Sequence, residues 1–238
     1  MNIYEKKNIG DILAKCAYPG RGIVAGLSEN GRYAAFAYFI MGRSGNSRNR
    51  VFRSDGETVT IYPFDESKVS DPSLIIYSPV RKVGDRLVVT NGDQTDTVCS
   101  FLERGSTFEA ALETREFEPD APNFTPRISA MLDLGKDFSY RMSILKSADE
   151  NGSACCRFTY AFPGVPGLGH FIHTYAGDGN PLPTFSAEPE RVTVPDSADE
   201  LFSAVWENLN EENKISLVVR YTDLETGETE ERLVNKNV

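Results

Sequence analysis

The stretch that decides the fold is VVTNGDQTDT, residues 88–97, where an apolar run meets a polar cluster. Apolar residues at helical spacing follow it, so the sequence predicts a strand over residues 86–90 and a helix over residues 93–104. The Asn-Gly pair between them suits a turn with positive φ, and Asp93 or Thr95 would cap the helix. Such a junction directs backbone N–H groups outward, where either solvent or an anion could lie.

Working outward, hydrophobic periodicity predicts further helices at residues 9–16, 108–114 and from about residue 195. It predicts further strands at residues 22–27, 33–40, 58–62, 74–77, 128–134, 139–145, 154–161, 215–221 and 230–234. The strand at residues 33–40 is apolar on both faces, which implies cover from more than one layer. The chain shows no internal repeat or linker. We therefore predict an α+β fold, with stacked sheets between helical layers, in a single domain of residues 1–238.

Composition limits the function classes. The 238 residues carry a formal net charge of −10, which disfavours non-specific binding to nucleic acid or to an anionic membrane. No apolar run approaches the length that spans a bilayer, and residues 1–7 lead into no signal-type hydrophobic region. A cytoplasmic protein that binds neither nucleic acid nor membrane is expected.

Residues 42–53 interrupt this acidic chain with four arginines, Arg43, Arg48, Arg50 and Arg53. Small residues such as Ser44 are interleaved with them, directly after the buried strand. The segment is either a solvated loop or a clamp for a phosphate or carboxylate group.

The cysteines and histidines show no metal-binding pattern. Cys16, Cys99, Cys155 and Cys156 lack paired ligand spacing, and we expect buried reduced thiols. His170 and His173 are three residues apart, which on a strand points them to opposite faces. Joint metal ligation is therefore not expected, although either ring could be an acid-base group or serve in structure.

Several motifs occur in an order that resembles a known family. They are PGRGIVAGL (residues 19–27), Arg43-Ser44 with Arg48, VTNGDQTDT (residues 89–97) and TPRI (residues 125–128). Together they resemble the archaeal-type IMP cyclohydrolase family over residues 18–134. Beyond that, the resemblance is limited to IHTY at residues 172–175. The segment at residues 163–189 is longer than in the archaeal enzymes and differs from them in composition.

The resemblance implies a four-layer αββα sandwich like that of the N-terminal nucleophile hydrolases, without their nucleophile. It also implies an enzyme that closes 5-formamidoimidazole-4-carboxamide ribonucleotide to IMP with loss of water. That chemistry needs a cation clamp for a purine nucleotide monophosphate, but neither a metal nor another cofactor. By motif, the catalytic residues would be Arg48, Tyr77 and Glu118. The residues that line the nucleotide site would be Arg43, Ser44, Asn91, Gly92, Thr95, Asp96, Asn123, Thr125 and Arg127.

Without the resemblance, Glu118 would be an exposed loop carboxylate and Tyr77 a tyrosine at the edge of the core. Two other functions fit the same features. One is a non-catalytic purine-nucleotide-binding module. The other is an amide hydrolase of the same fold that uses Cys16 as its nucleophile after processing, although Cys16 is not N-terminal in this chain. A homo-oligomer is possible.

Overall fold

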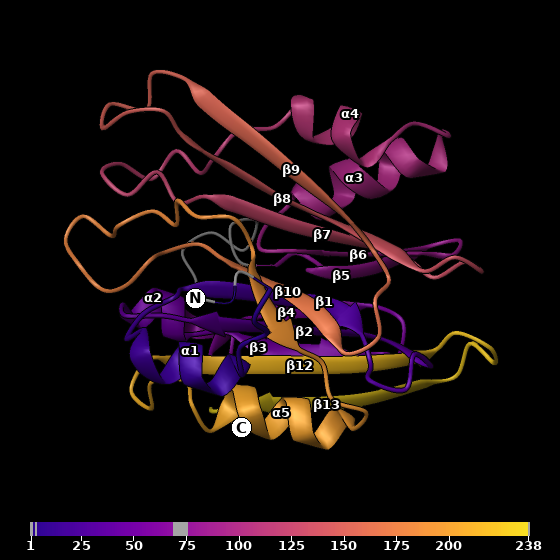
Figure 1. The fold of residues 1–238 in the computed structure, drawn as a ribbon. Helices are drawn as coiled ribbons and strands as arrows, with labels where there is room; N and C mark the ends of the chain where they lie inside the picture. The colour runs from indigo at the N-terminus through magenta and orange to yellow at the C-terminus, as the bar shows by residue number, and fades with distance from the viewer. Residues whose placement is uncertain (1, 3, 69–75, 238) are drawn as a thin grey trace.

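Two antiparallel sheets are stacked face to face in the computed structural model, which describes residue 2, residues 4–68 and residues 76–237 (Figure 1). The six-stranded sheet has the order β11 (Glu190–Thr193), β10 (Leu168–His173), β1 (Arg21–Leu27), β2 (Tyr33–Met41), β12 (Lys214–Asp223), β13 (Thr229–Asn235). The seven-stranded sheet has the order β3 (Val51–Ser54), β4 (Val59–Tyr62), β5 (Val80–Val83), β6 (Arg86–Thr90), β7 (Arg127–Asp133), β8 (Ser139–Ser147), β9 (Cys155–Pro163).

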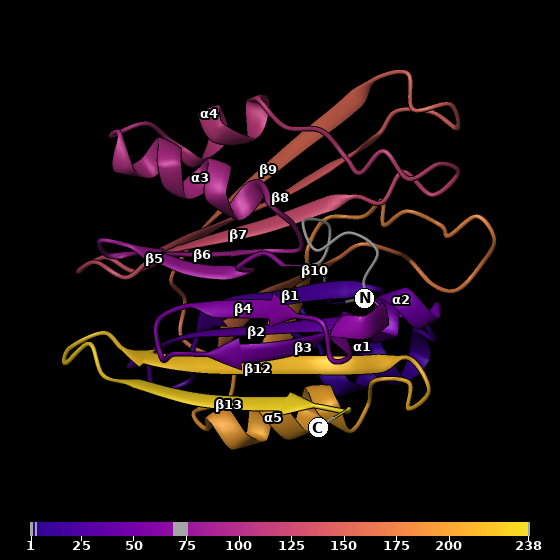
Figure 2. The same cartoon turned by 180° about the vertical axis from the view of Figure 1, so that it is seen from behind.

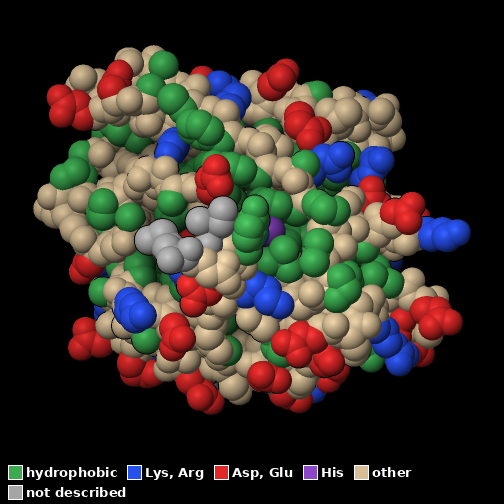
Figure 3. All heavy atoms as spheres, in the orientation of Figure 1, with side chains coloured by type: hydrophobic (Ala, Val, Ile, Leu, Met, Phe, Trp, Pro, Cys, Tyr) green, Lys and Arg blue, Asp and Glu red, His purple; other side chains and the backbone are tan. Residues whose placement is uncertain are grey.

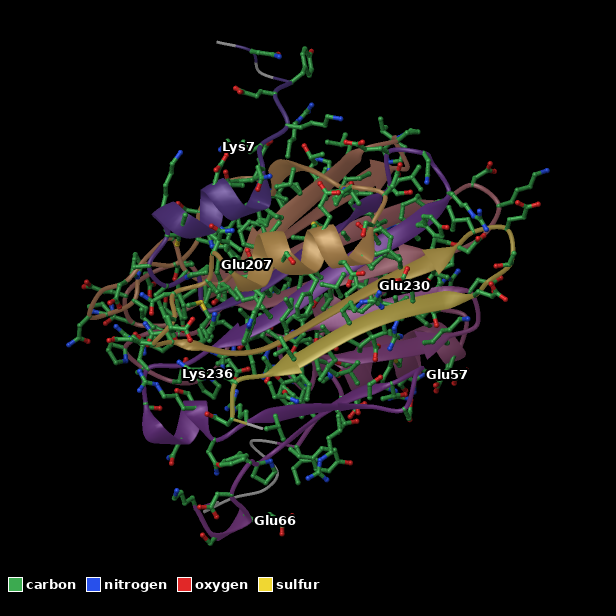
Figure 4. All side chains as sticks on the ribbon, turned by 90° about the horizontal axis from the view of Figure 1, so that it is seen from below. Lys7, Glu57, Glu66, Glu207, Glu230 and Lys236 are labelled. Carbon is green, nitrogen blue, oxygen red and sulfur yellow. The ribbon has the colours of Figure 1, made fainter. Side chains whose placement is uncertain are left out.

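Helices cover the outer face of each sheet. Helices α3 (Gln94–Glu103) and α4 (Phe108–Glu113) lie on the seven-stranded sheet, as the view from behind also shows (Figure 2). Helices α1 (Ile9–Lys15) and α5 (Ala198–Trp206) lie on the six-stranded sheet, and the view from below shows α5 across β12 and β13 (Figure 4). The short helix α2 (Gly45–Arg48) and the 3₁₀ helix η1 (Glu66–Lys68) lie in connections. The predicted α+β class is confirmed.

The core is divided into three apolar layers. The central layer lies between the sheets and includes Ile23, Tyr38, Val89 and Ile128, all with no exposed surface. A second layer joins the six-stranded sheet to α1 and α5, and a third joins the other sheet to α3 and α4. Both faces of β2 are therefore buried, as its apolar sequence predicts.

The junction at residues 88–97 forms the predicted strand and helix, but two details of its prediction are wrong. Asp93 occupies the N-cap position of α3 without a capping hydrogen bond, because its carboxylate binds arginines instead. Thr95 does not cap either, since its hydroxyl donates to the Gly92 carbonyl. Gly92 does not have a positive φ. Glycine is needed there for space instead, because a Cβ would lie 2.5 Å from Arg127 Nη1.

Other elements differ from the sequence prediction. Four observed strands were not predicted: β3, β5, β10 and β11. Three of them, β3, β5 and β11, have only four residues each. Residues 74 and 75 of the strand expected at 74–77 lie outside the described residues, and residues 76 and 77 are in a loop. Among the described residues, no helix is both long enough and apolar enough to cross a membrane.

Candidate active site

A cavity of about 600 Å³ opens where loops from both sheets meet. One wall comes from the start of β1 and the segment around α2. The opposite wall comes from the turn before α3 and from residues 118–127. The loop after β10 completes the lining of the cavity. The lining residues are Tyr18, Arg21, Arg43, Ser44, Ser47, Arg50, Tyr77, Asn91, Gly92, Asp93, Glu118, Pro119, Asp120, Asn123, Thr125, Arg127, Tyr175 and Leu182.

Arg21 and Arg50 lack an acidic counter-ion in this cavity. Arg21 Nη1 donates to the Met41 carbonyl at 2.7 Å, and the buried Nε of Arg50 has no hydrogen-bond partner within the described residues. No carboxylate in the described part of the chain lies within 4.0 Å of either guanidinium. Burial and the charge of Arg21 lower the pKa of Arg50. Two cations held together without a carboxylate favour an anionic ligand.

Arg127, by contrast, is fully compensated. Its Nη1 lies 2.7 Å from Asp93 Oδ1, 2.6 Å from Gln94 Oε1 and 3.2 Å from Glu118 Oε1. Arg115 Nη2 binds the other oxygen of Asp93 at 2.5 Å. Burial raises the pKa of Asp93, but Arg115 and Arg127 outweigh it, and the pKa is lowered overall. This chain of charges fixes Glu118 at the cavity wall.

Tyr77 and Asn91 are joined by a hydrogen bond. The Tyr77 hydroxyl donates to the Asn91 carbonyl at 2.7 Å. The Asn91 side chain donates to the Pro126 carbonyl and accepts from the backbone of Ile128, so its amide holds the 126–128 segment in place. Tyr77 therefore has a fixed direction, with an oxygen lone pair left for a ligand.

Two stacked tyrosines form an aromatic wall at the cavity. The rings of Tyr18 and Tyr175 lie 5.9 Å apart at 18°, and the Arg43 guanidinium lies over Tyr18 at 5.1 Å. The Tyr175 hydroxyl lies 2.5 Å from the Thr125 hydroxyl, which also contacts Asp120 at 2.5 Å. Tyr18 and Tyr175 are only 4% and 3% exposed, so their edges border the cavity while their ring faces pack within the protein.

The structure brings together most of the side chains that the sequence singled out. Those that line the cavity are Arg43, Ser44, Tyr77, Asn91, Gly92, Glu118, Asn123, Thr125 and Arg127. Three do not line it. Arg48 is exposed and donates to the Gly42 carbonyl and to Asn213, Thr95 is buried beneath the turn, and Asp96 pairs with Arg81.

Sequence reasoning did not assign Arg21, Arg50, Tyr18 or Tyr175 to the site. Arg21 and Tyr175 lie within the quoted motifs, and Arg50 lies in the arginine-rich run. Their residue types gave no reason to choose them, because the choice depends on where β1, α2 and β10 end. The segment at residues 163–189 also contributes, since Leu182 lines the cavity and its N–H donates to Asn123.

The two histidines lie away from this cavity and face opposite sides of β10, as predicted. His170 Nδ1 lies 2.7 Å from the Tyr140 hydroxyl, and its ring stacks on Phe162 at 3.6 Å. His173 stacks on Phe171 at 4.7 Å. Burial lowers the pKa of each histidine to about 4.

These buried histidines predict an acid-sensitive fold. The unfolded state takes up protons from about pH 6.5 downward, whereas the folded histidines stay neutral until about pH 4. The free energy of unfolding should therefore fall as the pH drops from 6.5 to 4, by up to about 1.4 kcal/mol per pH unit for each histidine. Urea titrations across this range would measure the slope. If a His170→Asn/His173→Asn variant showed the same dependence of the free energy of unfolding on pH, the buried histidines would not be its cause and the prediction would be refuted.

The thiols differ from expectation in part, because only Cys99 is buried and the other three are partly exposed. Among the residues that the structure describes, no three His, Cys, Asp or Glu side chains are grouped as metal ligands. No cysteine lines the cavity.

We therefore expect Cys16→Ala and a Cys155→Ser/Cys156→Ser variant to keep wild-type kcat within about twofold, since no thiol reaches the site. Steady-state assays would measure this. Loss of activity in Cys16→Ala with an intact circular-dichroism spectrum would show that the thiol takes part.

A family model described as IMP cyclohydrolase-like protein matches residues 18–228, which is most of the chain. The chain belongs to this family. It is 36% identical over 128 residues to an IMP cyclohydrolase of Methanococcus maripaludis, covering 52% of this chain and 61% of that protein. It is 35% identical to an IMP cyclohydrolase of Methanopyrus kandleri, covering 49% of this chain and 59% of that protein. An IMP cyclohydrolase of Methanocaldococcus jannaschii is 33% identical, with 49% and 57% covered. The matches thus span about three-fifths of these relatives.

Proposed function

We propose that this protein is an IMP cyclohydrolase, which closes 5-formamidoimidazole-4-carboxamide ribonucleotide to IMP and releases water. The main support is one observation: the uncompensated guanidiniums of Arg21 and Arg50 line the same cavity as Tyr77 and Glu118. Ring closure needs these kinds of group together, namely cations for a developing oxyanion and groups that move protons.

In the proposed reaction, the carboxamide nitrogen attacks the formyl carbon. The formyl oxygen gains negative charge, which Arg50 and Arg21 stabilise. Glu118, held by Arg127, takes a proton from the attacking nitrogen and passes it to the oxyanion, which becomes a hydroxyl group. The Tyr77 hydroxyl turns from the Asn91 carbonyl and protonates this group as the carbon–oxygen bond breaks, so that water leaves. The formamide nitrogen gives its proton to Tyr77 and forms a double bond to the same carbon. One nitrogen–carbon bond forms and one carbon–oxygen bond breaks, and the released water carries one proton from each of the two nitrogens.

The remaining lining groups would position the substrate. The edges of Tyr18 and Tyr175 would border the imidazole ring, and the Thr125 and Asn123 side chains would orient polar substituents. Arg43, Ser44 and Ser47 are clustered at the start of α2, where they would hold the monophosphate. Holding both reacting groups in contact supplies much of the rate in an intramolecular closure.

The same proposal extends to the fold and its setting. A helix layer, two sheets and a second helix layer support an N-terminal-nucleophile-hydrolase-like αββα sandwich in one domain. No cysteine or threonine at the chain start is needed for the chemistry above. We propose a cytoplasmic enzyme, because its charged nucleotide substrate is made and used there.

The decisive experiment is a turnover assay with the purified chain and the formylated ribonucleotide, following the absorbance of IMP as it forms. Tight binding of IMP without turnover would instead indicate a binding module that has kept the pocket. The hydrolase alternative predicts that the protein hydrolyses an amide and that Cys16→Ala abolishes this activity. The position of Cys16 outside the cavity argues against that alternative.

A further inference from the structure

A second cavity of about 550 Å³ lies between the N-terminal segment, α1 and the end of β10. Figure 4 shows Lys7 on the segment that leads into α1. The two cavities adjoin at the turn after β10, where Tyr175 lines the first and Ala176 the second. This volume is typical of a small-molecule site, and the proposed cyclisation uses none of its residues.

His173 presents an unsatisfied acceptor to this cavity. Its Nδ1 lies 2.8 Å from the Tyr175 carbonyl, which can only accept, so Nδ1 carries the proton of the neutral ring. Nε2 is then a bare lone pair, and it is buried with no hydrogen-bond partner among the described residues. Glu190 Oε1, another acceptor, lies 3.9 Å from Nε2. Two facing acceptors need a donor between them.

The charged groups around His173 and Glu190 add a second requirement for the ligand. Lys7 Nζ already pairs with Glu190 at 2.5 Å, whereas Lys15 also lines the cavity and forms no ion pair within the described residues. Lys6 lines the cavity as well, but a Cβ on Gly167 would lie 3.1 Å from Lys6 Nζ, so this ammonium lies at the opposite end of β10 from His173. Glu5 and Asp11 line it too, so the cavity has mixed charge and suits a ligand with both donors and an anionic group. Figure 3 shows the same mixture over one face of the molecule, where basic and acidic side chains alternate around apolar ones.

We propose that this second cavity binds a small organic anion with several hydroxyls, in which one hydroxyl donates to His173 Nε2, a second donates to Glu190, and the anionic group pairs with Lys15. The site is separate from the nucleotide cavity. Its occupant would touch the turn that holds Tyr175, because the Tyr175 carbonyl is the partner of His173.

Cys16 provides a local readout, since it lines the second cavity and not the first. Its thiol is partly exposed, and burial raises its pKa, so alkylation by iodoacetamide should be followed at mildly alkaline pH. Ribose 5-phosphate is a suitable probe, because it carries hydroxyls and a phosphate. At about ten times its Kd it should slow Cys16 alkylation about tenfold, as measured by peptide mass spectrometry. Cys155 and Cys156 are internal controls whose rates should not change.

Matched variants separate this site from the first. Protection should disappear in Lys15→Ala and persist in Lys82→Ala, an exposed lysine on β5. Protection should also persist in Arg50→Met, which removes a group of the proposed cyclisation site. The test of the second cavity therefore does not depend on the cyclohydrolase assignment. Ribose alone and inorganic phosphate alone should protect weakly. The proposal is overturned if ribose 5-phosphate leaves Cys16 alkylation unchanged, if protection survives in Lys15→Ala, or if inorganic phosphate protects equally well.

Discussion

Glu118→Gln and Tyr77→Phe should each lower kcat by roughly 10²–10⁴, the usual effect of removing general acid-base assistance. Glu118 is held 3.2 Å from Arg127 at the cavity wall, and Tyr77 is fixed by its hydrogen bond to the Asn91 carbonyl. Each substitution keeps the shape of the side chain and removes only the group that moves a proton. The appearance of IMP absorbance under saturating substrate would measure the loss.

Affinity for a substrate analogue should change little, because neither side chain is assigned to the phosphate. Two neighbours serve as matched controls: Glu116→Gln removes an exposed carboxylate beside Arg157, and Tyr62→Phe removes a hydroxyl on β4. Both should turn over normally. Near wild-type kcat in both Glu118→Gln and Tyr77→Phe would mean that positioning alone drives closure, and the acid-base assignment would have to be abandoned.

Arg50→Met should lower kcat by about 10²–10³, the effect seen when one donor to a developing oxyanion is removed. Methionine keeps the volume of the stem but removes the guanidinium. Because Arg50 lacks a carboxylate partner among the described residues, the variant leaves no orphaned acid, and stability should not suffer. Relief of the repulsion between Arg21 and Arg50 should even raise the free energy of unfolding slightly.

Arg48→Met is the matched control for Arg50→Met. Arg48 lies two residues away on the same segment, but its guanidinium is bound to Gly42 and Asn213 outside the cavity. The sequence assigned catalysis to Arg48, whereas the geometry favours Arg50. A large loss of kcat in Arg48→Met with a small one in Arg50→Met would return the role to Arg48. Urea titrations of both variants would show that folding is not the cause.

The periodic elements could be predicted from sequence because their apolar pattern is local. The hairpin of residues 22–27 and 33–40 and the strand-turn-helix at residues 86–104 are confirmed within one or two residues. The four-residue strands β3 and β5 were missed, because VFRS and VRKV show too few alternations to stand out from a loop. Their strand state depends on neighbours that only the folded sheet supplies.

Residues inside a motif could be assigned to the candidate site from the sequence. Residues whose assignment depends on the direction of the side chain could not. Asn91, Gly92 and Arg127 line the cavity, and they lie in the motifs VTNGDQTDT and TPRI on which the family resemblance depends. Arg48 and Arg50 could not be separated, since the turn of α2 directs one outward and the other into the cavity. Asp93 was expected to cap α3, but two arginines distant in sequence compete for its carboxylate.

The pairing of Arg43 has a consequence for how a charged ligand enters. Arg43 Nη1 lies 2.5 Å from Asp178 and 2.9 Å from the Gly179 carbonyl, so residues 178 and 179 provide its counter-ion at the cavity rim. Both side chains are substantially exposed, and a pair of this kind contributes about 0–1 kcal/mol. If Arg43 binds the monophosphate as proposed, the phosphate would replace Asp178 at little cost, and residues 178 and 179 would lose their contacts with Arg43.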